Sequence, residues 1–461
     1  MPDKWEYPWY AAWDLAFHCV TLAHIDPEFA KQQLILLLRE WYMHPNGQIP
    51  AYEWAFGDVN PPVHAWAAWQ VYQIAGGNDR DFLTRVFGKL LLNFGWWVNR
   101  KDADGSNLFE GGFLGMDNIG LFDRSAALPD GARLEESDAT SWMAAFCLDM
   151  LTIAIELARL EPAWDELATK FLEHFLAIAH AMRGFGSDGV TLWDDDDGFF
   201  YDVLVHPDGR AEQLRARSMV GLLPMLAVAN APAGTTDQLP DFTARLRWLQ
   251  VRRPDLLDGL LVHVGDNGAA GDALLALLDP DRLRRLLARM FDEQEFLSPH
   301  GIRSLSAAYR DPYTVVVEGQ QLSIDYEPGE SRTGLFGGNS NWRGPVWFPV
   351  NVLLADALRG YHRYLGDAFT VEVPTGSGRL LTLADAADVI GQRLVAIFRV
   401  GPDGARPGDG ARIEASPDPL WREHITFNEY FHGDTGEGLG ATHQTGWTAL
   451  VADIICRQRH A

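Results

Sequence analysis

Cysteine and long apolar runs are scarce in this sequence of 461 residues. The three cysteines, Cys19, Cys147 and Cys456, are an odd number, lie far apart and each fall in an apolar helical pattern. They are typical of small buried side chains rather than disulfides, which favours a reducing, cytoplasmic location. No apolar stretch approaches the roughly 18 residues that predict a membrane span. The first ten residues do not have the pattern of a signal peptide.

Basic residues are also few. The chain has 38 Lys and Arg against 63 Asp and Glu, a formal net charge of −25. Nucleic acids and anionic membrane surfaces are bound by basic patches, so this balance argues against both as partners. We therefore expect a neutral or weakly charged small ligand.

Aromatic residues, by contrast, are plentiful, with 17 Trp, 24 Phe and 12 Tyr. Many lie beside Gly, Pro and Asp in predicted loops, where a core alone would not place them. Aromatic faces in a polar cleft suit sugar rings, which combine apolar C–H patches with hydroxyl groups. The alternative is that most of the tryptophans fill the seams between helices.

Apolar residues recur at helical spacing along most of the chain. We predict helices at 10–23, 27–44, 60–74, 79–99, 138–160, 164–182, 218–229, 239–250, 280–291, 349–365, 382–398 and 445–457. A strand at 313–317 and a small hairpin at 371–383 are the predicted exceptions. Twelve helices in paired succession can close as an all-α, (α/α)6 toroid forming one domain over residues 1–461. An open solenoid would repeat at a fixed period, and none is found.

Two loops contain carboxylates in unusual surroundings. Asp117 lies in the glycine-rich loop 111–123, where a raised pKa would suit an acid. The alternative for Asp117 is a helix cap or a loop hydrogen bond. Glu429 lies in loop 421–446 between Phe427 and Tyr430, a setting that suits activation of a water molecule. The alternative for that loop is a glycine-rich helix entry.

Two further positions combine a polar side chain with tryptophan. Arg343 follows Trp342 and offers a bidentate donor beside an aromatic platform, or pairs structurally with a loop carboxylate. Asp14 follows Trp13 at the start of an apolar helix, as a cap or as an acceptor for hydroxyl groups. No His/Cys cluster has zinc spacing, and the acidic run 194–197 is typical of a solvated turn. We predict no catalytic metal and no cofactor.

Three ordered passages resemble glycoside hydrolase family 63, most of all its bacterial branch of mannosylglycerate and glucosylglycerate hydrolases. They are Gly115-Met116-Asp117-Asn118, Asn341-Trp342-Arg343-Gly344-Pro345-Val346-Trp347, and Asn428-Glu429-Tyr430 with the following Thr445-Gly446-Trp447. The resemblance covers nearly the whole chain. It implies the (α/α)6 catalytic domain alone, because the chain begins almost at the first helix of that domain.

The resemblance also implies roles for single residues. Asp117 matches the general acid and Glu429 the general base of an inverting α-glycosidase. The expected sugar-cleft positions are Trp13, Asp14, Tyr52, Trp54, His64, Trp342, Arg343, Tyr430 and Trp447. The expected substrate is a small α-glucoside or α-mannoside, including one with a glycerate-like aglycone.

Other functions remain open on the sequence alone. A sugar epimerase on the same fold would use histidines such as His300, His424 and His443, and a phosphorylase would depend on phosphate. A sugar-binding or inactive scaffold protein would bind a saccharide without hydrolysing it.

Overall fold

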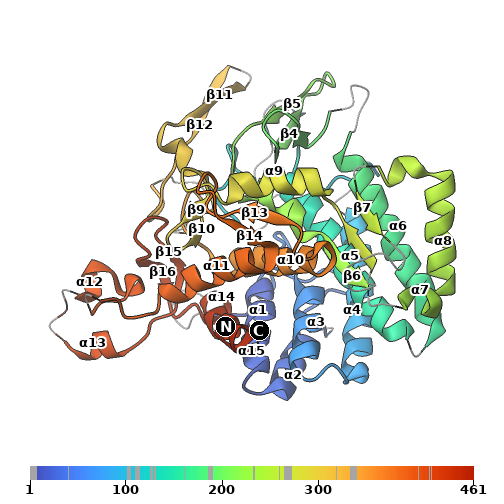
Figure 1. The fold of residues 1–461 in the computed structure, drawn as a ribbon, viewed down its shortest axis with the longest axis horizontal. Coiled ribbons are helices and arrows are strands. Elements are labelled where there is room, and N and C mark those ends of the chain that lie inside the picture. The colour runs from blue at the N-terminus through green and yellow to red at the C-terminus, as the bar shows by residue number, and fades with distance from the viewer. Residues whose placement is uncertain are drawn as a thin grey trace.

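Helices form the body of the molecule, and short β-hairpins extend from it (Figure 1). The computed structural model describes residues 8–39, 41–100, 105–109, 115–124, 128, 131–159, 161–184, 190–231, 234–258, 260–263, 273–317, 319–332, 340–402, 404–414, 416 and 418–460. Residues 111–114 of the glycine-rich loop lie outside these ranges, whereas Asp117 and all the other candidate site residues lie within them.

The first half of the chain contains six long helices where six were predicted, although α2 ends seven residues before the predicted 44 and α3 begins four residues after the predicted 60. They are α1 (Ala12–Ala23), α2 (Pro27–Leu37), α3 (His64–Ile74), α4 (Arg80–Arg100), α5 (Ser137–Ala158) and α6 (Asp165–Met182). The start of α2 has the capping residues that predicted it. Asp26 accepts a hydrogen bond from the backbone N of Phe29, and Pro27 occupies the first turn.

The second half mixes long and short helices. They are α7 (Thr235–Gln238), α8 (Pro240–Arg252), α9 (Pro280–Met290), α10 (Phe348–Leu365), α11 (Leu383–Ala396), α12 (Gly410–Glu414), α13 (Leu420–Glu423), α14 (Thr445–Thr448) and α15 (Leu450–His460). Side chains cap two of them, because Asp279 accepts from the first turn of α9 and Thr382 from that of α11.

Strands are more numerous than the all-α prediction allowed, and that class is too narrow. Every ladder in the described part of the chain is antiparallel and short. Two three-stranded sheets have the orders β1-β4-β5 and β6-β8-β7, and the other strands form hairpins. The predicted strand at 313–317 (β11) and hairpin at 371–383 (β13 and β14) are confirmed.

The strands are β1 (Arg133–Glu135), β2 (Trp193–Asp194), β3 (Phe199–Phe200), β4 (Asp202–Val205), β5 (Ala211–Leu214), β6 (Val228–Ala231), β7 (Leu261–His263), β8 (Ala273–Ala276), β9 (Leu297–Ser298), β10 (Gly301–Ile302), β11 (Tyr313–Val317), β12 (Gln320–Ile324), β13 (Thr370–Glu372), β14 (Leu380–Thr382), β15 (Asn428–Phe431) and β16 (Gly438–Thr442).

The predicted helix at 218–229 is wrong. The chain there forms a 3-10 segment, Met219–Leu226, followed by β6. Pro224 lies inside the segment and has no N–H to continue an α-helical ladder. Gly221 also packs closely, since a Cβ there would lie 2.2 Å from the ring of Phe199.

Contacts between elements close into a cycle. α1 contacts α3, α3 contacts α5, and α5 packs on the 3-10 segment. That segment contacts α10, α10 contacts α15, and α15 returns to α1. α2, α4, α6 and α11 each pack on members of this cycle. The cycle places the first and last helices side by side, which brings loops from distant parts of the chain together.

α5 is the most apolar member of the cycle. By length and composition it could cross a membrane, but 83% of that window is buried inside the fold. A buried core helix satisfies the same criterion of length and composition. The contacts of α5 with α3, α4, α6 and the 3-10 segment are those of such a helix.

Candidate active site

Asp117 lies in a turn within the glycine-rich loop, with its side chain half-buried. Burial raises the pKa of its carboxyl group to about 7, and the negative charge of Asp58 adds to the rise. A hydrogen bond from the hydroxyl of Ser340 and a backbone hydrogen bond act in the opposite direction. Asp117 can therefore hold a proton near neutral pH and release it to a substrate.

The Asp117 turn is held by residues 341–343 through buried hydrogen bonds. Asn118 accepts at Oδ1 from the backbone N of Trp342 (2.7 Å) and donates from Nδ2 to Oδ1 of Asn341 (3.0 Å). Arg343 donates from Nε to the carbonyl of Asn118 (2.7 Å) and from a terminal nitrogen to that of Gly120 (3.0 Å). These bonds fix the backbone that follows Asp117.

Glu429 lies on β15, in the hairpin with β16. The ladder register shifts between Asn428 and Tyr430, so Glu429 sits at an irregular point of the hairpin. Its side chain is 5% exposed, and Oε2 accepts a hydrogen bond from the backbone N of Ala441 (3.1 Å). Gly440 has a left-handed φ of +68°, and a Cβ there would lie 2.5 Å from Oε2 of Glu429. The hairpin therefore needs glycine at this point for the carboxylate to keep its position.

A cluster of aromatic rings joins the two loops. The Trp13 ring lies 4.4 Å from that of Trp447 and 6.4 Å from that of Trp342, measured between centroids. Trp342 stacks on Trp347 at 4.0 Å, and Trp347 stacks on Tyr430, the neighbour of Glu429, at 4.6 Å.

Trp13 also contacts the Asp117 loop directly. A Cβ on Gly115, whose φ is +75°, would lie 2.7 Å from the Trp13 ring. The aromatic cluster therefore touches the loop of Asp117 on one side and the hairpin of Glu429 on the other.

Asp14 is a third buried carboxyl group in this region. Gln444, immediately before α14, donates from its side-chain amide to Oδ1 of Asp14. Burial raises the pKa of Asp14 to about 6, and the hydrogen bond from Gln444 opposes that rise. A Cβ on Gly446 would lie 3.0 Å from that of Asp14, so α14 packs directly on the start of α1.

Three predicted sugar-cleft residues, His64, Tyr52 and Trp54, come from the segment 52–64. His64 is buried, and its Nε2 donates to the carbonyl of Ala12 (3.1 Å). Burial lowers the pKa of His64 to about 4, so it is a neutral structural residue, and its predicted contact with sugar is not supported. Tyr52 and Trp54 are 40% and 61% exposed. They lie on the loop of Asp58, whose carboxylate is 3.4 Å from the Tyr52 hydroxyl, and their contact with sugar stays a prediction.

Three other predicted residues are buried behind the surface of the site. Trp342 and Tyr430 are 0% exposed, so neither ring presents a face to a sugar, and both assignments are corrected to packing roles. Tyr430 donates from its hydroxyl to Glu330 (2.8 Å). Arg343 is also buried, and its hydrogen bonds to the Asp117 turn give it a structural role. The contacts of Trp13, Asp14 and Trp447 with a substrate stay predictions.

Sequence reasoning missed the residues that tune and position the two carboxylates. Ser340 precedes the Asn341-Trp342-Arg343 passage, and its hydroxyl next to that motif was the available signal. Asp58 acts on Asp117 from a distant loop, and Gly440 leaves room for Glu429 from the facing strand, so neither left a local pattern. Among the described residues, no group of three His, Cys, Asp or Glu side chains is arranged to hold a metal ion.

The fold is that of known glycoside hydrolases. It is similar to the GH63 mannosylglycerate hydrolase from Thermus thermophilus in complex with glucose, with a TM-score of 0.59 and 17% identity, covering 98% of this chain and 94% of that one. The same hydrolase in complex with Tris and D-glycerate gives a TM-score of 0.58 and 16% identity, with coverage of 98% and 94%. At these low sequence identities, the two structural similarities show a shared fold alone.

The family follows from the sequence match. The mannosylglycerate hydrolase MGH1-like glycoside hydrolase domain matches residues 7–252 and 272–448, and the chain belongs to this family. The resemblance to glycoside hydrolase family 63 is thereby confirmed. An uncharacterized protein of Saccharomyces cerevisiae is 50% identical over 474 residues, which cover 99% of this chain and 43% of that protein. The chain thus spans less than half the length of that relative.

Proposed function

We propose that this chain is an inverting α-glycosidase in which Asp117 is the general acid and Glu429 the general base. The observation that carries the proposal is the aromatic cluster that touches both loops. It links the loops of two carboxyl groups whose positions differ by 312 in the sequence (429 − 117), and this supports their action on one sugar. Two carboxyl groups flanking one scissile bond are the minimum that this reaction requires.

Asp117 suits the role of the acid because it holds its proton near neutral pH. Burial raises its pKa to about 7, so a substantial fraction is protonated where its ordinary range would leave it ionised. In the proposed step this proton moves to the glycosidic oxygen as the bond to the sugar breaks. The departing oxygen therefore leaves as a hydroxyl group instead of an alkoxide.

Glu429 suits the role of the base because it is fixed in the hairpin. The backbone N of Ala441 holds Oε2, and the aromatic neighbours Tyr430 and Trp347 back the strand. In the proposed step Glu429 takes a proton from a water molecule that attacks the anomeric carbon opposite the leaving group. Inverting enzymes hold the two carboxyl groups ~6.5–9.5 Å apart to leave room for that water.

The frame for this site is, in our proposal, an (α/α)6 toroid formed by one domain. The closed cycle of contacts from α1 through α10 and α15 back to α1 supports it. One inner position is then occupied by the 3-10 segment Met219–Leu226 and β6 instead of a regular helix. The catalytic loops follow or precede members of this cycle and would meet at one mouth of the toroid.

The proposed substrate is a small α-glucoside or α-mannoside. Support comes from the glucose and D-glycerate in the complexes of the Thermus thermophilus hydrolase. If the aglycone is glycerate, Arg343 is poorly placed to bind its carboxylate, because its guanidinium donates to the carbonyls of Asn118 and Gly120. We therefore expect the aglycone to be recognised by other groups.

The test is a screen of α-glucosides and α-mannosides, including the glycerate conjugates, with purified protein and two variants. Asp117→Asn and Glu429→Gln should each lower kcat at least ~1,000-fold. Each change removes a group that transfers a proton in the reaction and also places a charge beside the reacting atoms. Asp367→Asn and Glu166→Gln are matched controls on exposed sites and should keep full activity. Full activity in either catalytic variant, or no hydrolysis of any substrate, would contradict the proposal.

A further inference from the structure

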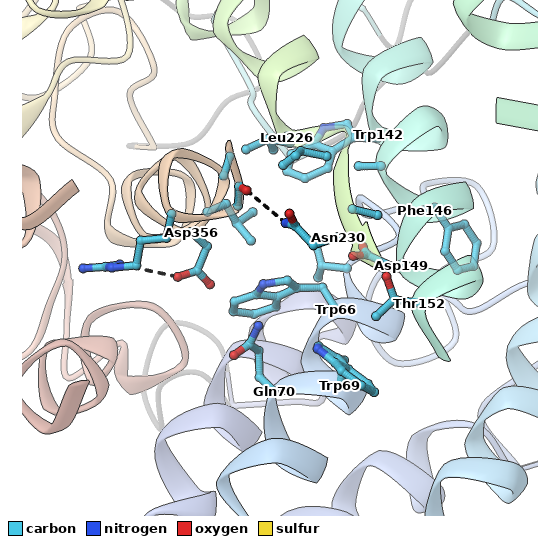
Figure 2. Close-up of a pocket in the computed structure, with 18 of the residues that line it drawn as sticks. Trp66, Trp69, Gln70, Trp142, Phe146, Asp149, Thr152, Leu226, Asn230 and Asp356 are labelled. Carbon is cyan, nitrogen blue, oxygen red and sulfur yellow. Dashed lines mark hydrogen bonds and ion pairs between the residues drawn. The ribbon is translucent and has the colours of Figure 1, made fainter. Parts of the chain in front are cut away.

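A cavity of about 210 Å³ is lined by residues of α3, α5, α10 and β6 (Figure 2), and neither Asp117 nor Glu429 is among its lining residues. Its walls include Trp66, Trp69, Trp142, Asp149 and Asp356. The volume far exceeds the roughly 10–15 Å³ that one water molecule needs. It is therefore large enough to admit a small organic molecule.

The position of the cavity along the helices separates it from the catalytic loops. α5 begins at Ser137, and Asp149 follows twelve residues later, about 18 Å along the helix. α10 begins at Phe348, beside Trp347 of the aromatic cluster, and Asp356 follows eight residues later, about 12 Å along the helix. These two cavity residues thus lie about half-way along their helices, away from the helix starts that adjoin the candidate active site.

Phe17 links the cavity wall to the aromatic cluster of the candidate active site. Its ring lies 5.4 Å from that of Trp66, which lines the cavity. The same ring lies 6.1 Å from that of Trp447 and 6.2 Å from that of Trp13. The cavity is therefore a neighbour of the aromatic cluster, but the residues that line it are different ones.

Four polar atoms around the cavity have no partner within the described residues. Trp66 and Trp142 are 8% and 3% exposed, and neither indole N–H has an acceptor in that part of the chain. The side-chain oxygens Oδ2 of Asp356 and Oδ1 of Asn230 are buried there without a hydrogen-bond donor. A ligand with both hydroxyl hydrogens and hydroxyl oxygens would satisfy all four atoms.

The charges around the cavity favour a neutral ligand. Arg457 pairs with Asp356 (2.6 Å) and Asp453 (2.7 Å), and Arg359 pairs with Asp388 (2.9 Å). These two guanidinium groups are already neutralised. Arg363 also lines the cavity, but it is exposed, so solvent and salt screen its charge and the attraction for an anion is small.

The remaining carboxyl group, Asp149, is largely neutral at pH 7. Burial raises its pKa to about 8, and the nearby charge of Asp356 adds to the rise. A protonated Asp149 offers one more hydroxyl donor to a ligand and little attraction to a cation.

We propose that this cavity is a second carbohydrate site that binds one neutral monosaccharide-sized polyol. Trp66, Trp69 and Trp142 supply the aromatic surface for C–H patches, and the indole N–H groups of Trp66 and Trp142 donate to ligand oxygens. Asp149, Asp356 and Asn230 supply partners for ligand hydroxyl groups. Figure 2 shows Trp66, Trp142, Asn230 and Asp356 around the open space.

Calorimetric titration with D-glucose, D-mannose and glycerol tests this site. Trp142→Phe keeps an aromatic ring and removes the N–H, so it should weaken the binding of at least one of these polyols about ten-fold. Asp149→Leu keeps the approximate volume and should abolish that binding event. Trp248→Phe, at a tryptophan that is 46% exposed and outside the cavity, is the matched control and should bind like the wild type.

Hydrolytic activity separates this site from the proposed catalytic one, because all three variants should retain it. If Asp149→Leu does not fold, the Trp142→Phe comparison alone still decides the question. Wild-type affinity for every polyol in Trp142→Phe would overturn the proposal, as would the absence of any polyol binding. Binding of choline in place of the polyols would overturn the assignment to a neutral ligand.

Discussion

Asp117 is the single residue whose protonation state decides the proposed chemistry. A general acid acts only in its protonated form, and the protonated fraction falls as pH rises through the pKa. With a pKa of about 7, kcat should therefore decline on the alkaline side of neutrality. Two neighbours act on this pKa in opposite directions, which gives a paired test.

Replacing each neighbour should move the alkaline limb of the pH profile. Ser340→Ala removes a hydrogen bond that favours the ionised form, so the pKa of Asp117 should rise and the limb should move to higher pH. Asp58→Asn removes a negative charge that disfavours the ionised form, so the limb should move to lower pH. The measurement is kcat against pH for the three proteins. Shifts in the same direction, or an unmoved limb, would exclude Asp117 as the titrating acid.

At the scale of elements, the β15–β16 hairpin positions the proposed base. Its irregular register places Glu429 opposite Gly440 and Ala441, and both contact the carboxylate. A bulge with a left-handed glycine re-aims a side chain in this way without breaking the hairpin.

Gly440→Ala should therefore displace the carboxylate of Glu429. The added Cβ would lie 2.5 Å from Oε2, and a displacement of about 1 Å can lower the rate roughly 100-fold. Gly376→Ala is the matched control, because Gly376 has a similar φ of +81° but open space around it. Both variants incur the same backbone strain, about 1–2 kcal/mol, and only Gly440→Ala should lose activity. Equal kcat values for the two would show that the hairpin does not position the base.

The 341–343 passage plays the corresponding part for the Asp117 turn. Arg343→Lys keeps the charge but cannot reproduce the fork that reaches both Asn118 and Gly120. We expect about 1–2 kcal/mol of lost stability and roughly a ten-fold fall in kcat, with KM nearly unchanged. Chemical denaturation and steady-state kinetics measure the two effects. A raised KM confined to glycerate conjugates, with normal kcat, would instead make Arg343 a substrate ligand.

At the scale of the whole molecule, helical periodicity predicted most of the long helices because their apolar faces repeat along the chain. Caps such as Asp26-Pro27 and Asp279-Pro280 marked two starts well, since capping is a local interaction. The 3-10 segment was missed because its apolar residues repeat like those of a helix while Pro224 prevents one. The short hairpins depend on pairing between segments and have weak local signals.

The candidate site was predictable only in part, for a similar physical reason. Motif resemblance singled out Asp117 and Glu429 as candidates, but exposure is a property of the folded molecule. Trp342 therefore looked like a sugar platform in the sequence, although stacking on Trp347 buries it completely. Ser340 and Asp58 influence Asp117 across the fold. The position of Ser340 directly before the 341–343 passage was a weak local signal, whereas Asp58 had none.

The proposed mechanism depends on the whole molecule bringing two distant loops to one sugar. Proton NMR of the first product formed from a hydrolysed α-glucoside or α-mannoside tests this most directly. We predict that the β-anomer appears first, and that its formation is lost in both Asp117→Asn and Glu429→Gln. Initial release of the α-anomer, or unchanged product formation by either variant, would contradict the inverting mechanism and the assigned pair.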